Sequence, residues 1–232
     1  MRFFLVESGP VRLLPFRKIA LLFLIMTCGC KEPAYFISSN ELNKEKVILY
    51  LRDQSRIPGT LTISLENFYN LNVDSKTSIR FIPEGDSLEK DINLKAIEGY
   101  SIGPDFYALK KLDLFMNNTF YLLFVKRLTT ESSKIQLYEL YESGRGNNTG
   151  EIKYSYYLSL PSYGPLETMN TRSSGLVPFF DEKMSEIVHD CPALSRKIQS
   201  KENGYFLPLT SFNIKKHPEV LLKIINEYNN CK

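Results

Sequence analysis

The chain has 232 residues, with 29 basic and 26 acidic side chains, a formal net charge of +3 and no tryptophan. Glycine and proline number 12 each and 24% of the residues are charged, which excludes a collagen-like, coiled-coil or disordered chain. The length allows a hydrophobic core that needs no metal for stability, and a net charge of +3 is too small to predict a nucleic-acid-binding protein.

Residues 1–29 have the order of a secretory signal peptide. Basic residues at positions 12, 17 and 18 precede an uninterrupted apolar run from Ile19 to Met26, which small residues follow. At about 1.5 Å per residue this run is shorter than the ~30 Å hydrocarbon core, so we do not expect a transmembrane helix. Four basic and one acidic side chain fall in this segment, which therefore accounts for the whole surplus of +3.

A cysteine follows the apolar run directly. Gly29 and Cys30 resemble the end of a bacterial lipobox, in which a small residue precedes a cysteine whose thiol is alkylated by diacylglycerol. Cys30 is preferred to Cys28 as the lipidated residue, because Gly29, which precedes Cys30, is smaller than Thr27, which precedes Cys28. Thr27 also lies three residues before Cys30, where a lipobox usually has a leucine. The other interpretation is an ordinary signal peptide with two incidental cysteines. Since two or three acyl chains anchor a protein stably, we expect a lipidated Cys30 followed by a tether, together residues 30–44.

Residues 45–165 alternate short apolar runs with turn residues and are expected to form an antiparallel sheet domain. The strict alternation from Thr60 to Leu65 indicates a strand with one buried face. Because the runs recur at short spacing with no helical period between them, the pattern predicts a barrel or a sandwich. The predicted strands are rich in β-branched and aromatic residues: Val47–Arg52, Gly59–Leu65, Thr77–Ile82, Ile97–Ile102, Asp105–Leu109, Thr119–Arg127, Ile135–Tyr141 and Ile152–Leu160.

Residues 166–178 are expected to be a linker, and residues 179–232 a helical region packed on the sheet. Apolar residues in this last region recur at three- and four-residue intervals, which is typical of amphipathic helices. Asp181 is available as the N-cap of a first helix, Pro192 is expected near the start of a second, and His217 near the start of a third. The sequence therefore predicts an α+β fold, an antiparallel β-rich barrel or sandwich followed by a helical region.

Two cysteines remain if Cys28 leaves with the signal peptide and Cys30 carries lipid, namely Cys191 and Cys231. In an oxidising envelope compartment an even number of remaining cysteines suggests a disulfide. This disulfide would link the last helix to the one before it. A metal site and a reactive thiol are the alternatives. The chain has only two histidines and no metal-ligand spacing, so we expect the disulfide, with no metal and no cofactor.

His189, Asp190 and Cys191 have the residue types of a cysteine hydrolase. Consecutive residues on a helix point about 100° apart, however, so these side chains cannot form a base-oriented nucleophile among themselves, and a disulfide would consume the thiol. Ser195 lacks the flanking glycines of a nucleophile elbow, and His217 precedes a proline where capping is the simpler role. We therefore predict no catalytic residue.

Tyrosines gather on two neighbouring predicted strands. Tyr138 and Tyr141 lie on one strand, and Tyr154, Tyr156 and Tyr157 lie on the next. Aromatic rings in such a cluster can stack on a ligand, but in sheets they also form core and cross-strand pairs. Tyr138, Tyr141, Tyr154 and Tyr156 are therefore the candidates for ligand binding, with core packing as the alternative.

Several short motifs together resemble a family of exported Bacteroidota proteins. The most specific are Asp190-Cys191-Pro192 and the terminal Asn230-Cys231, and the glycine-containing strand Ile97–Tyr100 is also similar to that family. Cys30-Lys31-Glu32 looks like the start of Bacteroidota lipoproteins that reach the outer membrane. The family has no assigned activity, so the resemblance implies the compartment and a bridge between Cys191 and Cys231, and no mechanism.

The expected function is that of a membrane-anchored envelope lipoprotein, a non-catalytic binding or assembly module at the outer membrane. Its expected partners are the lipid bilayer, through acylated Cys30, and an envelope protein, with no nucleic acid. The alternative is a hydrolase-like envelope enzyme whose residues are too dispersed to form a motif. A pocket with a carboxylate or histidine of perturbed pKa would favour the enzyme, whereas a flat aromatic patch would favour binding.

Overall fold

The computed structural model describes residues 40–63, 78–113, 120–143, 152–171, 175–208 and 217–231. The expected signal peptide, Cys30 and the expected tether up to residue 39 lie outside these residues. All the described residues belong to one compact unit, Phe36–Lys232.

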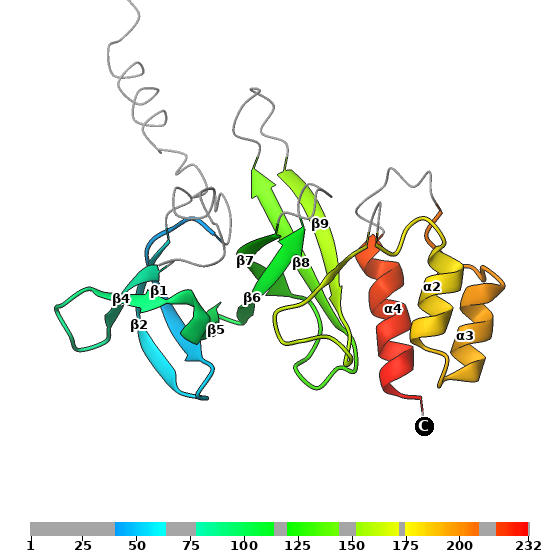
Figure 1. The fold of residues 1–232 in the computed structure, drawn as a ribbon, viewed down its shortest axis with the longest axis horizontal. Helices are drawn as coiled ribbons and strands as arrows, with labels where there is room; N and C mark the ends of the chain where they lie inside the picture. The colour runs from blue at the N-terminus through cyan, green and yellow to red at the C-terminus, as the bar shows by residue number, and fades with distance from the viewer. Residues whose placement is uncertain are drawn as a thin grey trace, which may run out of the picture. The chain divides into compact units, whose positions relative to one another are not determined.

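Ten strands in the described residues form one antiparallel sheet (Figure 1). Their order is β10-β9-β8-β7-β6-β5-β1-β2-β3-β4, so neighbours follow one another along the chain except where β5 returns to pair with β1. A short 3-10 helix, η2 (Leu94–Ala96), leads into β5. The strands are β1 (Leu42–Leu51), β2 (Arg56–Ile63), β3 (Ser78–Pro83), β4 (Lys90–Asn93), β5 (Ile97–Ile102), β6 (Asp105–Asp113), β7 (Phe120–Arg127), β8 (Gln136–Ser143), β9 (Ile152–Ser159) and β10 (Met169–Asn170).

The sheet is open, so the prediction of a closed barrel is wrong. Its edges are β4 and β10, and all ten strands belong to one hydrogen-bonded sheet, whereas a sandwich would have two. The alternation of apolar residues shows which face of a strand is buried, but it carries no information on whether the edges of the sheet meet. Both edge strands are short, four residues in β4 and two in β10, which limits unwanted pairing with another chain.

The eight predicted strands each correspond to a strand of the sheet, with ends that differ by a few residues. β1 begins at Leu42, inside the segment expected to be a tether, and β6 extends to Asp113 instead of ending at Leu109. The sequence does not predict β4, because this strand is mostly polar, or β10, because its two residues are too few to show an alternating pattern. Residues 64–65, 77 and 119 of the predicted strands lie outside the described residues.

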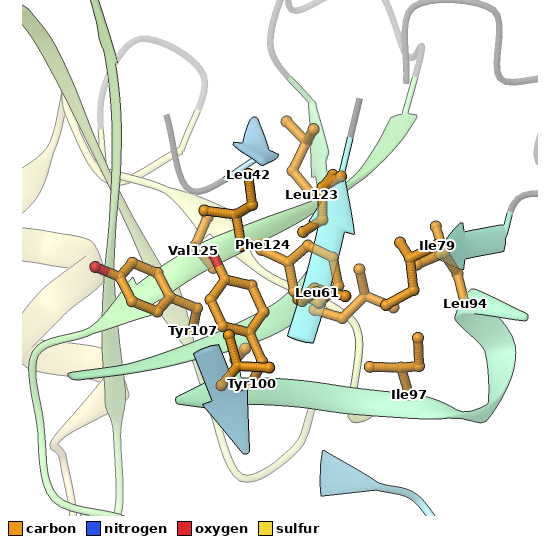
Figure 2. Close-up of a cluster of buried hydrophobic side chains, with 14 of the residues drawn as sticks. Leu42, Leu61, Ile79, Leu94, Ile97, Tyr100, Tyr107, Leu123, Phe124 and Val125 are labelled. Carbon is orange, nitrogen blue, oxygen red and sulfur yellow. The ribbon is translucent and has the colours of Figure 1, made fainter. Parts of the chain in front are cut away.

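The strands β1 to β3 and β5 to β9 contribute buried side chains to one hydrophobic cluster, the sheet cluster (Figure 2). Leu49 of β1 lies opposite Tyr100 of β5, and both side chains are fully buried. Tyr100 stacks on Tyr107 with ring centroids 4.9 Å apart and meets Phe124 at 5.0 Å. Alternate apolar positions such as Val47 and Leu49 give β1 one buried face. In β6 and β7 three consecutive residues are buried, Tyr107–Leu109 and Leu123–Val125, so these strands are buried on both faces.

β8 and β9 are buried on both faces because they lie between two clusters. Tyr138 and Tyr157, which are directly opposite each other, belong to the sheet cluster. Leu137, Tyr156 and Leu158 belong to a second cluster, the helical cluster, which includes side chains from all three helices. The helices therefore pack on β8 and β9.

Three helices in the described residues, α2 (Phe180–Ile187), α3 (Pro192–Gln199) and α4 (His217–Asn229), confirm the predicted α+β class. α3 begins at Pro192 itself, where the missing amide hydrogen of proline costs nothing. The N-cap of α2 is Phe179, so the expectation for Asp181 is wrong. Asp181 lies in the first turn, where its charge favours the helix N-terminus, and it pairs with Lys201 at 3.2 Å.

The predicted disulfide between Cys191 and Cys231 is confirmed, with the two Cα atoms 5.9 Å apart. It joins the residue before α3 to the chain just after α4. The loop between β7 and β8 holds the same end of α4 by hydrogen bonds. The Lys134 amide donates to Asn229 Oδ1 at 2.9 Å, and Lys134 Nζ donates to the Cys231 carbonyl oxygen at 3.1 Å.

Residues 166–178, expected to be a linker, contact the sheet and the helices. The Lys111 amide donates to the Leu166 carbonyl oxygen at 2.8 Å, and the Thr168 hydroxyl donates to the Lys111 carbonyl oxygen at 2.9 Å. Leu176 is fully buried in the helical cluster. This segment therefore extends the core along β6 as well as connecting the sheet to α2.

Candidate functional site

A groove of about 660 Å³ lies over β1, β5 and β6, on the face of these strands away from Leu49 and Tyr100. Ile48 and Tyr50 alternate with buried residues along β1, so their side chains point to this face. Ser101 lies opposite Ile48, and Phe106 lies opposite Ser101, which continues the same face across β5 and β6. Residues of the β1–β2 and β5–β6 turns and Glu131 of the β7–β8 loop complete the lining.

Two arginines lie on two aromatic rings in this groove, and Tyr50, Arg56, Phe106 and Arg127 are called here the arginine–aromatic cluster. Arg56 Cζ is 5.1 Å from the centre of the Tyr50 ring, and Arg127 Cζ is 4.4 Å from the centre of the Phe106 ring. The two rings meet edge to face at 5.1 Å. Each guanidinium is held by its ring and keeps N–H donors for a further partner.

Gly99 makes room for this cluster. It lies opposite Tyr50 on β1 and opposite Ala108 on β6. A Cβ atom at this position would meet Phe106 Cζ at 2.8 Å and would also meet the carbonyl oxygen of Tyr107. The Phe106 ring therefore lies over the Gly99 backbone, where it reaches Tyr50.

Two carboxylates, those of Glu98 and Glu131, line the groove together with Arg56 and Arg127. Glu131 is at the rim, where its side chain is 79% exposed and lies 3.9 Å from Arg127. Solvent screens such an exposed carboxylate strongly. The Arg127 side chain is only 18% exposed, so the guanidinium is the better protected charge of this pair and favours an anion.

Lys110 adds a second buried cation next to the groove. It is 7% exposed, and its Nζ donates to the Pro165 carbonyl oxygen at 2.6 Å and lies 4.8 Å from the Tyr138 ring centre. Burial lowers the pKa of Lys110 to about 8; Arg127 is among the cations that lower it further, and Glu98, which lines the groove, acts against this shift. Lys110 therefore offsets the charge of Glu98.

A second hollow of about 480 Å³ adjoins the groove and shares Ile48, Ser101 and Gly103 with it. Pro58 of β2 and Ile82 of β3 contribute apolar surface to this hollow. Ile48 is 41% exposed and lines both hollows. Apolar side chains therefore continue from the arginine–aromatic cluster across β1 toward β3, and the charged residues Lys46, Glu84 and Asp86 also line this hollow.

The four tyrosines predicted as ligand-binding candidates do not share one surface. Tyr138 is buried in the sheet cluster and Tyr156 in the helical cluster. Tyr141 and Tyr154 are partly buried and face each other across β8 and β9, with ring centroids 6.5 Å apart. None of the four lines the groove, although Tyr138 stacks on Lys110 beside it. Their positions are those of core and cross-strand pairs.

Glu139 is a carboxyl group with a raised pKa at the junction of β7 and β8. Burial raises the pKa of Glu139, against the effects of a hydrogen bond from Tyr156 and of the Lys126 charge. Lys126 itself is 2.7 Å from Asp105. Two carboxylates, a lysine and a tyrosine thus gather on the core side of the sheet, away from the residues that line the groove.

The residues considered for nucleophilic chemistry make local contacts in or near the helices. The Cys191 thiol is in the disulfide. The Ser195 hydroxyl is buried and donates to the Ser185 carbonyl oxygen at 3.1 Å, and His189 Nδ1 is 2.8 Å from the Glu186 carbonyl oxygen. His217 is buried at the first residue of α4. Ser195 and His189 do line one hollow of about 370 Å³ between α2 and α3, together with Asp181, Glu182 and Glu186. The hydrogen bonds given above are to backbone carbonyl oxygens and do not join the Ser195 hydroxyl to His189.

Within the part of the chain that the structure describes, no group of three or more His, Cys, Asp and Glu side chains is placed to hold a metal ion. The helices found in the same residues are too short or too polar to cross a membrane. Comparison with protein-family models, curated proteins and solved structures found no match. The resemblance to exported Bacteroidota proteins therefore stays a prediction that rests on the short motifs.

Sequence reasoning does not identify the arginine–aromatic cluster, although one signal for it exists. The run Val47–Leu51 is apolar throughout, whereas a strand with one wet face is expected to alternate. Apolar side chains on the face away from the core mark a surface that has another use. Arg56, Phe106 and Arg127 join this surface only through strand pairing, which the sequence does not specify.

Proposed function

We propose that this protein is a lipid-anchored, non-catalytic binding module of the cell envelope that binds its ligand in the groove. The arginine–aromatic cluster is the observation that carries the binding half of this proposal. Its donors are held in place before a ligand arrives, which reduces the entropy that binding costs. The volume of the groove, about 660 Å³, is typical of a small-molecule site.

The anchoring half rests on Gly29 and Cys30. Acyl chains on Cys30 would hold the domain at the outer membrane, and residues 31–39 would connect it to β1, which begins at Leu42. The disulfide between Cys191 and Cys231 suits an oxidising envelope compartment, where such a bond persists. An envelope protein partner would then meet the domain beside the membrane.

Photo-crosslinking in intact cells tests whether the groove is occupied in the envelope. A photoreactive amino acid replaces Ile48, which lines both hollows. The same replacement at Leu88, which is 68% exposed and lines neither hollow, is the control. We expect adducts on irradiation at Ile48 in excess of those at Leu88. Equal yields at the two positions would contradict the proposed site.

The enzyme alternative has one specific observation in its favour, the raised pKa of Glu139. A carboxyl group that stays protonated at higher pH is a typical general acid. Turnover assays on a panel of hydrolase substrates, with the wild type and Glu139→Gln side by side, separate the two functions. We expect no turnover by either protein. Turnover by the wild type that Glu139→Gln loses would favour the enzyme.

A further inference from the structure

The chemistry of the groove specifies the class of ligand, an inference that rests on the proposed binding function. Arg56 Cζ lies over the Tyr50 ring and Arg127 Cζ lies over the Phe106 ring, 5.1 Å and 4.4 Å from the ring centres. In this arrangement the N–H groups lie at the edge of the plane, and two parallel N–H donors match the two oxygens of a carboxylate or phosphate. A partner with a single acceptor atom, or one without charge, would not accept both of these parallel N–H groups.

The charges around the groove select for an anion. Arg127 is shielded from solvent, whereas its carboxylate neighbour Glu131 is mostly exposed. Lys110, buried next to the groove, offsets the second carboxylate, Glu98. Arg56 is in contact with Tyr50 and has no ion pair within the described residues. Arg127 is therefore the best shielded charge of the groove, although equal numbers of arginines and glutamates line it.

The second hollow specifies the other end of the ligand. It begins at Ile48, which it shares with the groove, and continues over Pro58 and Ile82. An apolar group that covered the exposed part of Ile48 would gain about 25 cal/mol for each Å² removed from water. We propose that the groove binds a small amphiphilic acid, with its carboxylate or phosphate on Arg56 and Arg127 and its apolar part along Ile48.

Isothermal titration calorimetry with three probes tests this proposal on the full-length lipidated protein in a neutral maltoside detergent. Phenyl phosphate has both required parts, inorganic phosphate lacks the apolar part, and phenyltrimethylammonium carries the opposite charge. We expect phenyl phosphate to bind at least about tenfold more tightly than either of the others, since each omits one complementary contact. Equal affinities for phenyl phosphate and phenyltrimethylammonium would overturn the proposal.

Single substitutions test whether phenyl phosphate binds in the groove. Arg56→Gln removes an exposed guanidinium and is expected to weaken phenyl phosphate binding by about tenfold or more, because charge-assisted hydrogen bonds are lost. Ile48→Ser is expected to bring phenyl phosphate to the affinity of inorganic phosphate. The matched control is Arg80→Gln, which removes an exposed arginine paired with Glu89 outside both hollows. Wild-type affinity in Arg56→Gln, or equal losses in Arg56→Gln and Arg80→Gln, would overturn the assignment.

The crosslinking and calorimetry experiments together distinguish a wrong ligand class from a wrong binding function. If the groove binds a ligand of another class, crosslinks at Ile48 form in cells while phenyl phosphate does not bind to the purified protein. If the groove is not a binding site, both experiments are negative.

Discussion

Gly99 is the residue at which the fold and the candidate site depend most closely on each other. Its missing side chain lets the Phe106 ring lie against the backbone of β5, and that ring supports the Arg127 guanidinium. A methyl group there would have to displace the ring and a backbone carbonyl of the next strand. Because a carbonyl in a strand ladder cannot move without breaking the ladder, the cost falls on the sheet as well as on the groove.

We expect Gly99→Ala to lower the free energy of unfolding by about 1–3 kcal/mol, the usual effect of overpacking. Gly164→Ala is the matched control, because a Cβ atom there would contact only the Glu167 side chain at ordinary distances of 3.6–3.8 Å. Urea denaturation of both variants measures the difference. Equal stability of Gly99→Ala and Gly164→Ala would show that the Phe106 ring can be accommodated elsewhere.

Lys110 makes stability depend on pH in a known direction. Burial lowers its pKa to about 8 in the folded protein, whereas an unfolded lysine has a pKa of about 10.4. Between these values the unfolded chain binds a proton that the folded chain does not, so this residue's contribution to the free energy of unfolding rises with pH. Relative to Lys110→Met, the wild type should gain about 1–2 kcal/mol between pH 7.5 and 9.5.

The Lys110 prediction is checked by urea denaturation of the wild type and Lys110→Met at both pH values. Lys111→Met, a change on the opposite face of the same strand, is the control for the loss of a positive charge. Tyrosines that titrate at high pH are present in all three proteins and cancel in the comparison. A difference between wild type and Lys110→Met that stays constant with pH would contradict the described burial of the amine.

Among the elements, α4 is held at its C-terminal end by the disulfide and by the β7–β8 loop. The bridge closes a loop of 40 residues between Cys191 and Cys231. On the chain-entropy model its removal is expected to lower the free energy of unfolding by about 4 kcal/mol. Thermal and urea denaturation of the double variant Cys191→Ser, Cys231→Ser measure this loss. A stability equal to that of the wild type would mean that the hydrogen bonds of Lys134 and the helical cluster suffice.

The elements are also the scale at which the sequence is most informative. The alternation in β2 and the three- and four-residue periods in α2 and α4 reflect which side chains are buried, so the strands and helices are found nearly where they are predicted. Strand pairing depends on contacts between distant residues, and neither the open sheet nor the pairing of β1 with β5 has a local signal. β10 has only two residues, too few to show a period.

The candidate site escapes sequence analysis for the same physical reason. Arg56, Phe106 and Arg127 come from three different strands and meet only because β5 returns to β1. The tyrosines of β8 and β9, which are close in sequence, do form cross-strand neighbours, but alternation places Tyr138 and Tyr156 in different clusters. Proximity along neighbouring strands predicts contact across the ladder, whereas it does not show which residues face a groove.

At the scale of the whole molecule, the chain after residue 29 has no net side-chain charge, because the surplus of +3 lies in the expected signal peptide. Long-range attraction to a charged surface would therefore contribute little to its placement. The proposed attachment through lipid and the proposed recognition through the arginines of the groove would suit such a neutral domain. The acyl group would keep the domain near its ligand, and the groove would discriminate among the molecules present there.

Metabolic labelling with an alkynyl fatty acid tests attachment through Cys30, the central claim, most directly. The wild type, Cys30→Ala and Cys28→Ala are expressed in bacterial cells, and label on the protein is compared with its recovery in the membrane fraction. We expect the wild type and Cys28→Ala to be labelled and recovered with membranes, and Cys30→Ala to lose both properties. An unlabelled wild type, or label retained in Cys30→Ala, would contradict the account.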